Sequence, residues 1–393
     1  MQEPTKLWNW KYLVFVGLQT LNYTMFYIAC PVIPKYAVSL GLALSIAGIL
    51  SGGYAIASLV ARPVAGYCID NFERKRIMVG ALILCGLSTA ALVLTKNWFI
   101  LLVLRVIYGA SFSFFSTMLV SCATDYIPKK NMAEGISYYG LGVALAAAIG
   151  PPVGLALSEM IGMKALFVVM GIVCLLSAAV VLFVPVAPKE HSGEKIPFSM
   201  SNVIERSVII FAVLVVPFTF SNGFINSFIA LTAEQRHIAG YSMFFTVFAV
   251  AMMILKPLSG KMQDKWGLAF VLVPAFILTA AASGLVAIGH TLILLIIAAV
   301  FLAFGQGAGQ PALLAKCVSC TDEEKRGIAI STYYLGMDFG IGVGIIAGSG
   351  IADALGYEGA YSFCGVLLVL GLLLYIAYEL KGKRRKNKDE ETV

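Results

Sequence analysis

Residues 62–70 read RPVAGYCID, and residues 256–264 read KPLSGKMQD. In both stretches a basic residue is followed by proline, then by glycine, and then by aspartate at the last position. The matched positions are separated by 194 residues, as Gly66 and Gly260 show. Four residue types at one spacing rarely recur by chance. The match therefore indicates that the chain contains an internal repeat.

A second pattern, far from the first, repeats at the same distance. Residues 142–154 carry a small residue at every fourth position, and so do residues 336–348. The matched residues are Gly142, Ala146, Gly150 and Gly154 in the first copy and Gly336, Gly340, Gly344 and Gly348 in the second. Small residues four apart share one helix face and permit close helix packing. Two patterns at one offset predict two homologous halves, residues 1–188 and 208–393, joined by the polar loop 189–207.

The composition places these halves in a membrane. Of the 393 residues, 60% are hydrophobic and 12% are charged, and the mean hydropathy is +0.89. Soluble proteins are about 25% charged, because their surfaces must be solvated. Soluble domains, disordered chains, coiled coils, nucleic-acid-binding proteins and secreted disulfide scaffolds are thereby excluded. We expect an integral membrane protein that is embedded in the lipid bilayer.

The length of the chain predicts twelve spans, since a spanning helix with its loop takes about 33 residues. Charged residues and Pro/Gly breaks mark the boundaries. The spans expected in the first half are Tyr12–Pro34, Ser45–Ile69, Ile77–Leu94, Phe99–Ala123, Ile136–Leu157 and Ala165–Val186. Those expected in the second half are Val208–Thr232, Tyr241–Leu258, Leu268–Ile288, Leu292–Ala315, Ile328–Ile351 and Tyr361–Leu380.

The basic residues predict the orientation of these spans. Lysine and arginine are retained on the cytoplasmic side of a membrane. If the N-terminus is cytoplasmic, most of the 28 basic residues fall on that side, including residues 74–76 and 383–386. We therefore expect both termini in the cytoplasm and the chain in the plasma membrane of a bacterium. The net charge of +7 then follows from topology and needs no nucleic-acid partner.

Three motifs resemble those of the major facilitator superfamily of transporters. Gly66, Asp70 and the basic run 74–76 resemble the signature loop between its spans 2 and 3. Arg105, followed four residues later by glycine in span 4, resembles a second family motif. The third motif is the one in span 5 that is typical of the drug:proton antiporters of the family, and it consists here of Gly150, Pro151 and Gly154.

The resemblance covers the whole chain and implies its fold. That fold is an all-α integral membrane protein with twelve transmembrane helices in two six-helix bundles, related as parallel repeats. Glu73 stands where the loop of the family usually has glycine, although the second copy has Gly267, and Leu155 replaces the last glycine of the span-5 motif. Transporters of this family work by alternating access, in which the two halves rock about a central site.

One acidic residue lies well inside a predicted span. Ten residues from Ile328 at 1.5 Å per residue place Asp338 about 15 Å deep, near the middle of a hydrocarbon core about 30 Å thick. A carboxylate at that depth is costly, so we expect Asp338 to take up and release a proton near neutrality. Its repeat mate is Ala144, so the shared architecture does not require the acid.

One basic residue also draws attention by its depth. Arg105 lies about seven residues into span 4, about 10 Å from the outer face. Arginine keeps its charge, so it needs carbonyls, water, an acid or an anion as its partner. In the family this arginine is associated with proton coupling. Our hypothesis is that Asp338 alternates between proton and substrate while Arg105 biases its proton affinity, and packing roles for both residues remain open.

Polar and aromatic residues at comparable depth are the candidates for binding substrate. Asn and Gln are costly in lipid unless they face water or another helix, so hydrogen bonding between helices explains any one of them equally well. The candidates are Asn22, Tyr23, Phe26, Tyr139, Asn222, Asn226, Gln306, Gln310, Tyr333 and Tyr334.

Charged residues of the cytoplasmic loops are expected to form a gate. The resemblance implies that Asp70 caps the start of span 11 and that Arg74 pairs with Asp125, which holds the halves closed on the cytoplasmic side. The expected gate residues are Arg62, Gly66, Asp70, Arg74, Asp125, Gly260 and Asp264. A role as turns and anchors is the alternative.

Motifs of enzymes are missing from the sequence. It contains no phosphate-binding loop and no His-Glu-x-x-His or Gly-x-Ser-x-Gly site. We therefore expect no enzymatic activity and neither a cofactor nor a metal, and we expect a proton gradient to be the energy source. The leading hypothesis is a monomeric, proton-coupled antiporter that exports a small organic molecule, a drug or a metabolite, by rocking of its two halves. The alternatives are an uptake symporter or organic-anion exchanger on the same fold, and a non-transporting membrane sensor or scaffold.

Overall fold

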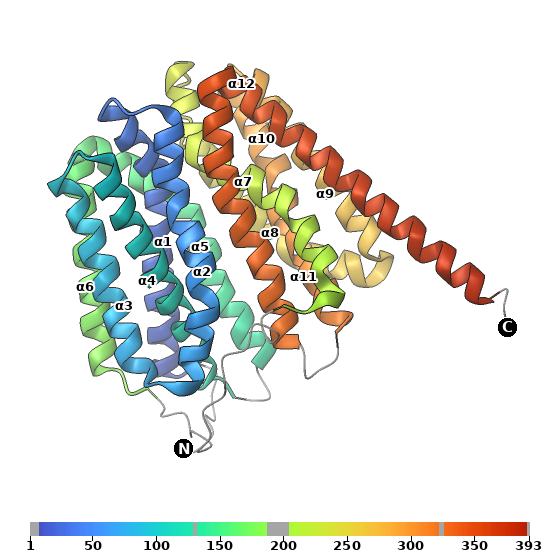
Figure 1. The fold of residues 1–393 in the computed structure, drawn as a ribbon, viewed down its shortest axis with the longest axis horizontal. Helices are drawn as coiled ribbons and strands as arrows, with labels where there is room; N and C mark the ends of the chain where they lie inside the picture. The colour runs from blue at the N-terminus through green and yellow to red at the C-terminus, as the bar shows by residue number, and fades with distance from the viewer. Residues whose placement is uncertain (1–7, 129–131, 187–203, 322–325, 391–393) are drawn as a thin grey trace.

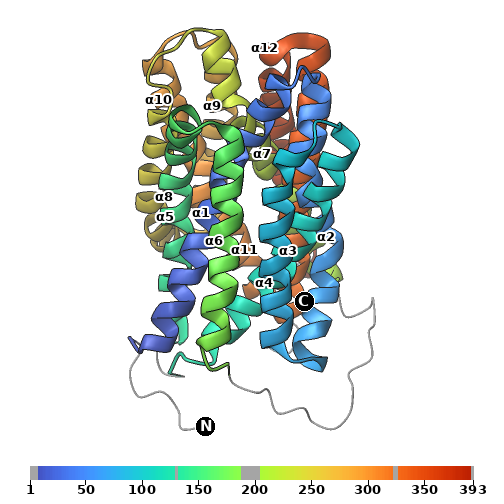
Figure 2. The ribbon, with the colours of Figure 1, turned by 90° about the vertical axis from the view of Figure 1, so that its left-hand side faces the viewer.

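The computed structural model describes residues 8–128, 132–186, 204–321 and 326–390, and all regular structure in these ranges is helical. The first half forms one bundle, which lies on the left in Figure 1. Its helices are α1 (Trp10–Ser39), α2 (Leu44–Asn71), α3 (Arg74–Ala91) with the 3₁₀ turn η1 (Leu92–Leu94), α4 (Trp98–Thr124), α5 (Met132–Met160) and α6 (Met163–Phe183). Figures 1 and 2 place α3 and α6 on the side of this bundle that faces away from the second half.

The second half forms the bundle on the right in Figure 1. Its elements are the short turn η4 (Arg206–Val208), α7 (Ile209–Gln235), α8 (Met243–Trp266), α9 (Leu268–Ile288), α10 (Leu292–Phe304), the π-helical turn η5 (Gly305–Gly309), α11 (Gln310–Ser319) and α12 (Arg326–Glu390). The elements α10, η5 and α11 follow one another without a break and together form one apolar span, Leu292–Cys317. A π-helical turn inside a helix often marks a functional position.

Eleven helices in the described part of the chain are long and apolar enough to cross a membrane. The last of them, Ile328–Lys381, has 54 residues and would be about 80 Å long if straight, far more than a bilayer needs. It turns back at Gly356, whose φ of 74° is a conformation that favours glycine. The described part of the chain thus has eleven such helices, of which α12 alone is long enough to form two spans, one on either side of Gly356.

Geometry supports the repeat as well. Gly162, which lies 194 residues before Gly356, also has a positive φ, 82°, at the turn after the fifth span of its half. At the other end of the bundle Gly267 has a φ of 85°, whereas Glu73 in the equivalent turn has a φ of −69°. The first copy of the loop therefore needs no glycine at position 73, which explains how Glu73 is tolerated there.

The glycine patterns bring helices close within each half. On α5, a Cβ atom at Gly150 would stand 2.6 Å from the Cβ of Tyr27 on α1, and Gly154 similarly faces Ile28. On α12, Gly344 lies directly against the backbone of Phe220 on α7, and its neighbours in the pattern face the same helix. The predicted close packing is thus confirmed, with α5 against α1 and α12 against α7.

The two halves are joined mainly along α2 and α12. A Cβ atom at Gly52 on α2 would stand 2.7 Å from the Cγ1 of Ile346 and 2.9 Å from the carbonyl oxygen of Gly342, both on α12. A Cβ atom at Gly342 would in turn stand 2.8 Å from the Cδ1 of Ile56. These small residues allow the two helices, and therefore the two halves, to approach closely.

The hydrophobic core divides along the axis of the bundle. We call the end where α1 begins the lower end and the end where α1 finishes the upper end, as in Figure 1. The largest cluster of buried residues reaches the upper end and draws on both halves, with Ile33 and Leu50 from the first and Phe224 and Leu295 from the second. Toward the lower end each half has a separate cluster of its own. The halves are therefore joined at the upper end and have separate cores below.

Candidate functional site

The central feature of the interior is an ion pair between the two halves. The Nε atom of Arg62 on α2 donates a hydrogen bond of 2.7 Å to the Oδ2 atom of Asp338 on α12. Counted along their helices, Asp338 lies about 18 Å and Arg62 about 14 Å from the lower ends. The Asp338 side chain is 16% exposed and that of Arg62 is 26% exposed, so the pair is mostly shielded from solvent.

The hypothesis that Arg105 acts on Asp338 is not supported by this geometry. The Nε atom of Arg105 donates to the backbone carbonyl of Leu50 at 3.0 Å, and its guanidinium lies 5.1 Å and 5.0 Å from the ring centroids of Tyr54 and Tyr108. Arg105 therefore holds α4 against α2, while Asp338 is paired with Arg62. The reason is steric, because Gly109 packs directly on the backbone of Tyr54 and brings α4 within reach of the carbonyl of Leu50.

An aromatic cluster lies in the interior of the first half. Tyr23 and Phe26 on α1 stand edge to face, with centroids 6.1 Å apart, and both contact Phe112 on α4. Tyr334 on α12 lies one turn before Asp338 and is 38% exposed. Tyr23, Phe26 and Phe112 thus form an aromatic cluster between α1 and α4, and Tyr334 lies on the helix that carries Asp338.

Other residues expected at the substrate site point elsewhere. Asn22 donates to the Leu18 carbonyl at 2.8 Å and to the Oγ of Ser177 on α6 at 3.1 Å, so it ties α1 to α6. Tyr333 is buried and donates to the backbone carbonyl of Gln310 at 2.7 Å. Asn22 and Tyr333 therefore hold helices within a half together.

Several of the remaining candidates have unpaired polar atoms. Within the described part of the chain, the Tyr139 hydroxyl, the Asn222 side-chain nitrogen and the Gln310 side-chain nitrogen are buried without a hydrogen-bond partner. Asn226 donates to the Asn222 carbonyl at 3.0 Å, and Gln306 is half-buried in the π-helical turn η5. Unsatisfied buried donors are costly, so these positions are suited to a water or ligand atom.

The expected gate residues at the lower end have a local arrangement. The guanidinium of Arg74 donates to Asp125 at 2.7 Å and to the Oγ of Ser121 at 3.0 Å, which links α3 to α4. Both partners belong to the first half, so this pair by itself does not bridge the halves. Gly66 and Gly260 have open space where a side chain would stand.

Two further gate residues and the linker fall outside what is described. The side chains of Asp70 and Asp264 lie outside the described part of the structure, and so do residues 187–203 of the expected linking loop. In the span-5 motif, Pro151 lies inside α5, which continues through it as a helix. Gly150 and Gly154 of that motif face α1, as described above.

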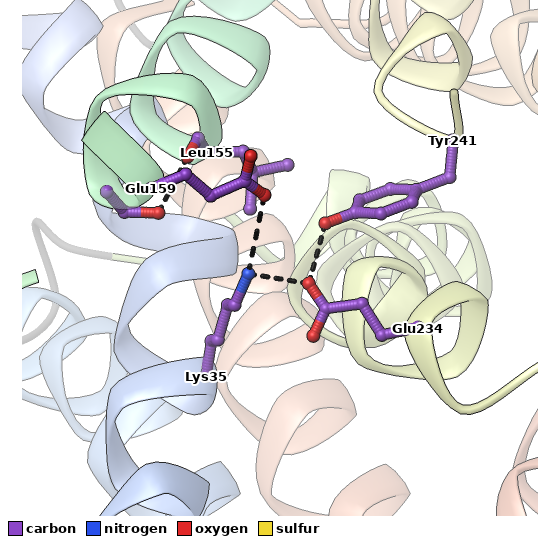
Figure 3. A network of polar contacts seen from close by, with 6 residues as sticks. Lys35, Leu155, Glu159, Glu234 and Tyr241 are labelled. Carbon is purple, nitrogen blue, oxygen red and sulfur yellow. Dashed lines mark hydrogen bonds and ion pairs between the residues drawn. The ribbon is translucent and has the colours of Figure 1, made fainter. Parts of the chain in front are cut away.

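Sequence reasoning missed a polar network at the upper end, shown in Figure 3. The Nζ atom of Lys35 on α1 lies 2.5 Å from Glu234 on α7 and 3.9 Å from Glu159 on α5. Tyr241 donates to the same Glu234 oxygen at 2.7 Å. Burial, followed by the hydrogen bond to Glu234, raises the pKa of Tyr241 above its usual value, so the hydroxyl remains a donor. No pattern in the sequence singles out Lys35, which directly follows the first predicted span, Tyr12–Pro34.

A second polar contact between the halves lies at the same end. Ser45 at the start of α2 donates to Asp353 on α12 at 2.8 Å, just before the turn at Gly356. Together with the Lys35 network and the shared core, it holds the upper ends of the halves together.

Cavities and metal ligands add little to this site. An apolar groove of about 580 Å³ lies between α2, α4 and Ile346 of α12, and it contains none of the predicted site residues. No group of three or more His, Cys, Asp or Glu side chains that suits a metal ion occurs within the described ranges.

Comparison with known proteins agrees with this architecture. The family model described as Major Facilitator Superfamily matches residues 15–239 and 209–392. An uncharacterised MFS-type transporter of Methanocaldococcus jannaschii is 23% identical over 361 residues, covering 89% of this chain and 93% of the relative. The staphylopine export protein of Staphylococcus aureus is 22% identical over 385 residues, covering 93% and 95%.

Solved structures share the fold. A variant of the nucleoside transporter NupG has a TM-score of 0.79 at 10% identity and covers 93% of this chain and 99% of its own. A bacterial homologue of the human lysosomal transporter Spinster, in an inward-facing and unoccupied conformation, has a TM-score of 0.76 at 16% identity, covering 93% and 95%. The chain therefore belongs to the major facilitator superfamily, whose members are membrane transporters and not enzymes.

Proposed function

We propose that the chain is a proton-coupled antiporter that exports a small organic molecule by alternating access. The observation that supports this most directly is the Arg62–Asp338 ion pair, because a single proton can break this contact between the halves. When Asp338 is protonated, its attraction to Arg62 is lost and α2 and α12 are free to separate at that level. Loss of the proton restores the pair. Proton binding thereby shifts the balance between two arrangements of the halves.

The division of the core supports a rocking motion. The halves share one core at the upper end, and each has its own core at the lower end. With both termini in the cytoplasm, as the basic residues predict, the lower end is the cytoplasmic side and receives the molecule to be exported. In the opposite arrangement the Lys35 network opens and the lower end closes. Asp70 is then proposed to meet the start of the eleventh span.

The proposed setting follows from the same features. Each chain contains both halves and both members of the ion pair, so we assign the activity to a monomer. The proton gradient across a bacterial plasma membrane supplies the driving force, and no cofactor takes part.

Uptake symport or organic-anion exchange is the second candidate. It is favoured by the excess of basic over acidic side chains among the described residues of the interior, where Arg62 and Arg105 accompany the acid Asp338. The non-transporting sensor or scaffold is not retained, because the family consists of transporters.

Proteoliposomes with a lumen more acidic than the medium test the proposal. Ethidium, an organic cation, and fluorescein, an organic anion, serve as solutes. An antiporter exchanges luminal protons for external solute and accumulates it, whereas a symporter accumulates solute only when the medium is the acidic side. We expect accumulation of at least one solute with an acidic lumen.

Asp338→Asn gives the first specific prediction. The amide cannot exchange a proton, so accumulation driven by the pH gradient should fall about tenfold or more, while exchange of labelled for unlabelled solute without a gradient persists. Glu379→Gln, which removes an acid near the C-terminal end of the same helix, is the control and should leave accumulation unchanged, because among the described residues Glu379 contacts only Tyr375 of its own helix. Full gradient-driven accumulation by Asp338→Asn would contradict the proposal.

A further inference from the structure

Lys256 is a charged residue at membrane depth that the proposed mechanism does not use. It lies on α8 within the span Met243–Gln263. Thirteen residues separate it from Met243 and ten from Trp266, which corresponds to about 20 Å and about 15 Å along the helix. Charged side chains at such depth face the interior of a bundle or water, because exposure to lipid is costly.

The position of Lys256 on α8 shows which way it faces. Met252 and Phe245, which lie four and eleven residues before it, share its helix face and are buried in the core that joins the halves. The exposed apolar stripe of α8 includes Ile254 and Leu258, each two residues from Lys256 and therefore on the opposite face. Lys256 itself is exposed. Its side chain thus faces the region between the halves, below the level at which their shared core ends.

Lys256 has no partner for its charge. Within the described part of the chain, no side chain or backbone group forms an ion pair or hydrogen bond with its Nζ atom. The ammonium group is therefore available to a ligand, because no described protein group offsets its charge.

The internal repeat explains why the partner is missing. Arg62 and Lys256 are repeat mates, and so are Asp338 and Ala144. The first basic residue therefore has an acid across the interface of the halves, whereas the second faces a helix that carries alanine at the equivalent position. The Arg62–Asp338 pair is neutral as a unit, so Lys256, like Arg105, adds a positive charge that no described acidic side chain offsets.

We propose that Lys256 binds an anionic group, a carboxylate or a phosphate, of the transported molecule. The proposal rests on the proposed transport function and specifies its substrate class as small organic anions. A carboxylate or phosphate supplies the charge-assisted hydrogen bonds that Lys256 lacks. The rings of Tyr23 and Phe26, together with Tyr334, suit an apolar or aromatic part of the same molecule.

Binding to the purified protein in neutral detergent tests this site without any pH gradient. Fluorescein and rhodamine 6G share one ring system but carry opposite charges, and fluorescence polarisation measures the affinity for each. We expect the wild-type chain to bind fluorescein more tightly than rhodamine 6G. In Lys256→Met the affinity for fluorescein should fall about tenfold or more, since a hydrogen-bonded charge contact is lost. Lys256→Arg should stay within about threefold of wild type, because the charge is kept.

Two further variants sharpen the result. Lys261→Met removes another exposed lysine of α8, on the lipid-facing side, and should leave the affinity within about twofold of wild type. Ala144→Asp supplies the missing acid and should weaken fluorescein binding as Lys256→Met does. If Ala144→Asp does not fold, as judged by size-exclusion chromatography, the fluorescein affinities of Lys256→Met and Lys261→Met still test the proposal.

Three outcomes overturn the proposal. They are absence of fluorescein binding, equal affinity in wild type and Lys256→Met, and displacement of fluorescein by phosphatidylglycerol micelles but not by citrate, which would assign the site to a lipid headgroup. Because these measurements need no gradient, intact Lys256-dependent binding together with uncoupled transport would overturn the proposed proton coupling alone.

Discussion

Arg105 shows at the scale of one residue how a deep charge can serve packing. Its guanidinium lies 5.1 Å and 5.0 Å from the ring centroids of Tyr54 and Tyr108 and donates a hydrogen bond to the Leu50 carbonyl. Arg105 as a whole is only 5% exposed. A cation over an aromatic face contributes about 0.5–2 kcal/mol, and a hydrogen bond from a charged group about 1.5–3 kcal/mol. Both contributions require the flat guanidinium, which a lysine does not supply.

Arg105→Lys should therefore destabilise the protein without uncoupling it. We expect a thermal unfolding midpoint several degrees below that of wild type in detergent, together with unchanged dependence of solute accumulation on the pH gradient. Arg76→Lys, at an exposed position, is the control and should leave the midpoint unchanged. Normal stability combined with lost proton coupling in Arg105→Lys would show that Arg105 acts on protons after all.

The sequence singled out Asp338 and Arg62 but did not pair them. Asp338 stood out because an acid deep in an apolar span is rare, and Arg62 because it belongs to the repeated loop motif. Their contact joins helices 276 residues apart in the chain, and no local pattern reports such a contact. Lys35 and Glu234 escaped notice for a related reason, since charges at the ends of spans are common and only the fold brings these two together.

At the scale of helices, the glycine pattern of α12 limits what can be inserted between α12 and α7. A Cβ atom at Gly344 would collide with the backbone of Phe220, which cannot move aside as a flexible side chain would. Gly350, six residues further along α12, has open space around it. Gly344 and Gly350 therefore lie on the same helix, but only Gly344 is in close contact with α7.

Gly344→Ala and Gly350→Ala form a matched test of this packing. Gly344→Ala should lower the unfolding midpoint, because overpacking of a tight contact costs about 1–3 kcal/mol. Gly350→Ala should be neutral or slightly stabilising, because alanine favours the helix by about 0.5–1 kcal/mol. Thermal shifts followed by size-exclusion chromatography measure both. Equal midpoints for the two variants would mean that the contact with Phe220 relaxes easily.

The sequence predicts which segments form helices better than it predicts the residues at which those helices begin and end. The ninth predicted span, Leu268–Ile288, coincides with α9. The eighth was expected to end at Leu258, yet α8 continues to Trp266. Hydropathy marks where apolar residues stop, but the following residues, with Gln263 and Lys265 among them, are compatible with a helix in water. The hydropathy pattern therefore indicates which part of a helix lies within the bilayer, and it does not indicate the full length of the helix.

At the scale of the whole molecule, the upper end acts as a joint between the halves. Lys35 connects α1 with α7 and α5, and its ion pair with Glu234 is only partly exposed to solvent. Removing its charge leaves two carboxylates, Glu159 and Glu234, on opposite sides of the joint. Their repulsion favours separation of the upper ends.

Lys35→Ala should therefore shift the balance toward an arrangement open at the upper end. A contact of about 1 kcal/mol corresponds to a change of about fivefold in population. Hydrogen exchange should increase in peptides that cover the upper ends of α7 and α8, as measured by mass spectrometry. Lys96→Ala removes an exposed lysine from the α3–α4 turn at the same end and should leave exchange unchanged. Equal exchange in both variants would rule out this role for Lys35.

The shared core at the upper end also bears on how the protein is made. Residues of this core come from both halves, with Phe224 and Phe228 on α7 filling the side opposite Ile33 and Leu50. During synthesis the first six spans enter the membrane before α7 exists, so lipid must cover that face of the first half until α7 arrives. Assembly of the first half is then completed by the second, and a chain that stops after α6 would keep an interface for a partner that is never made.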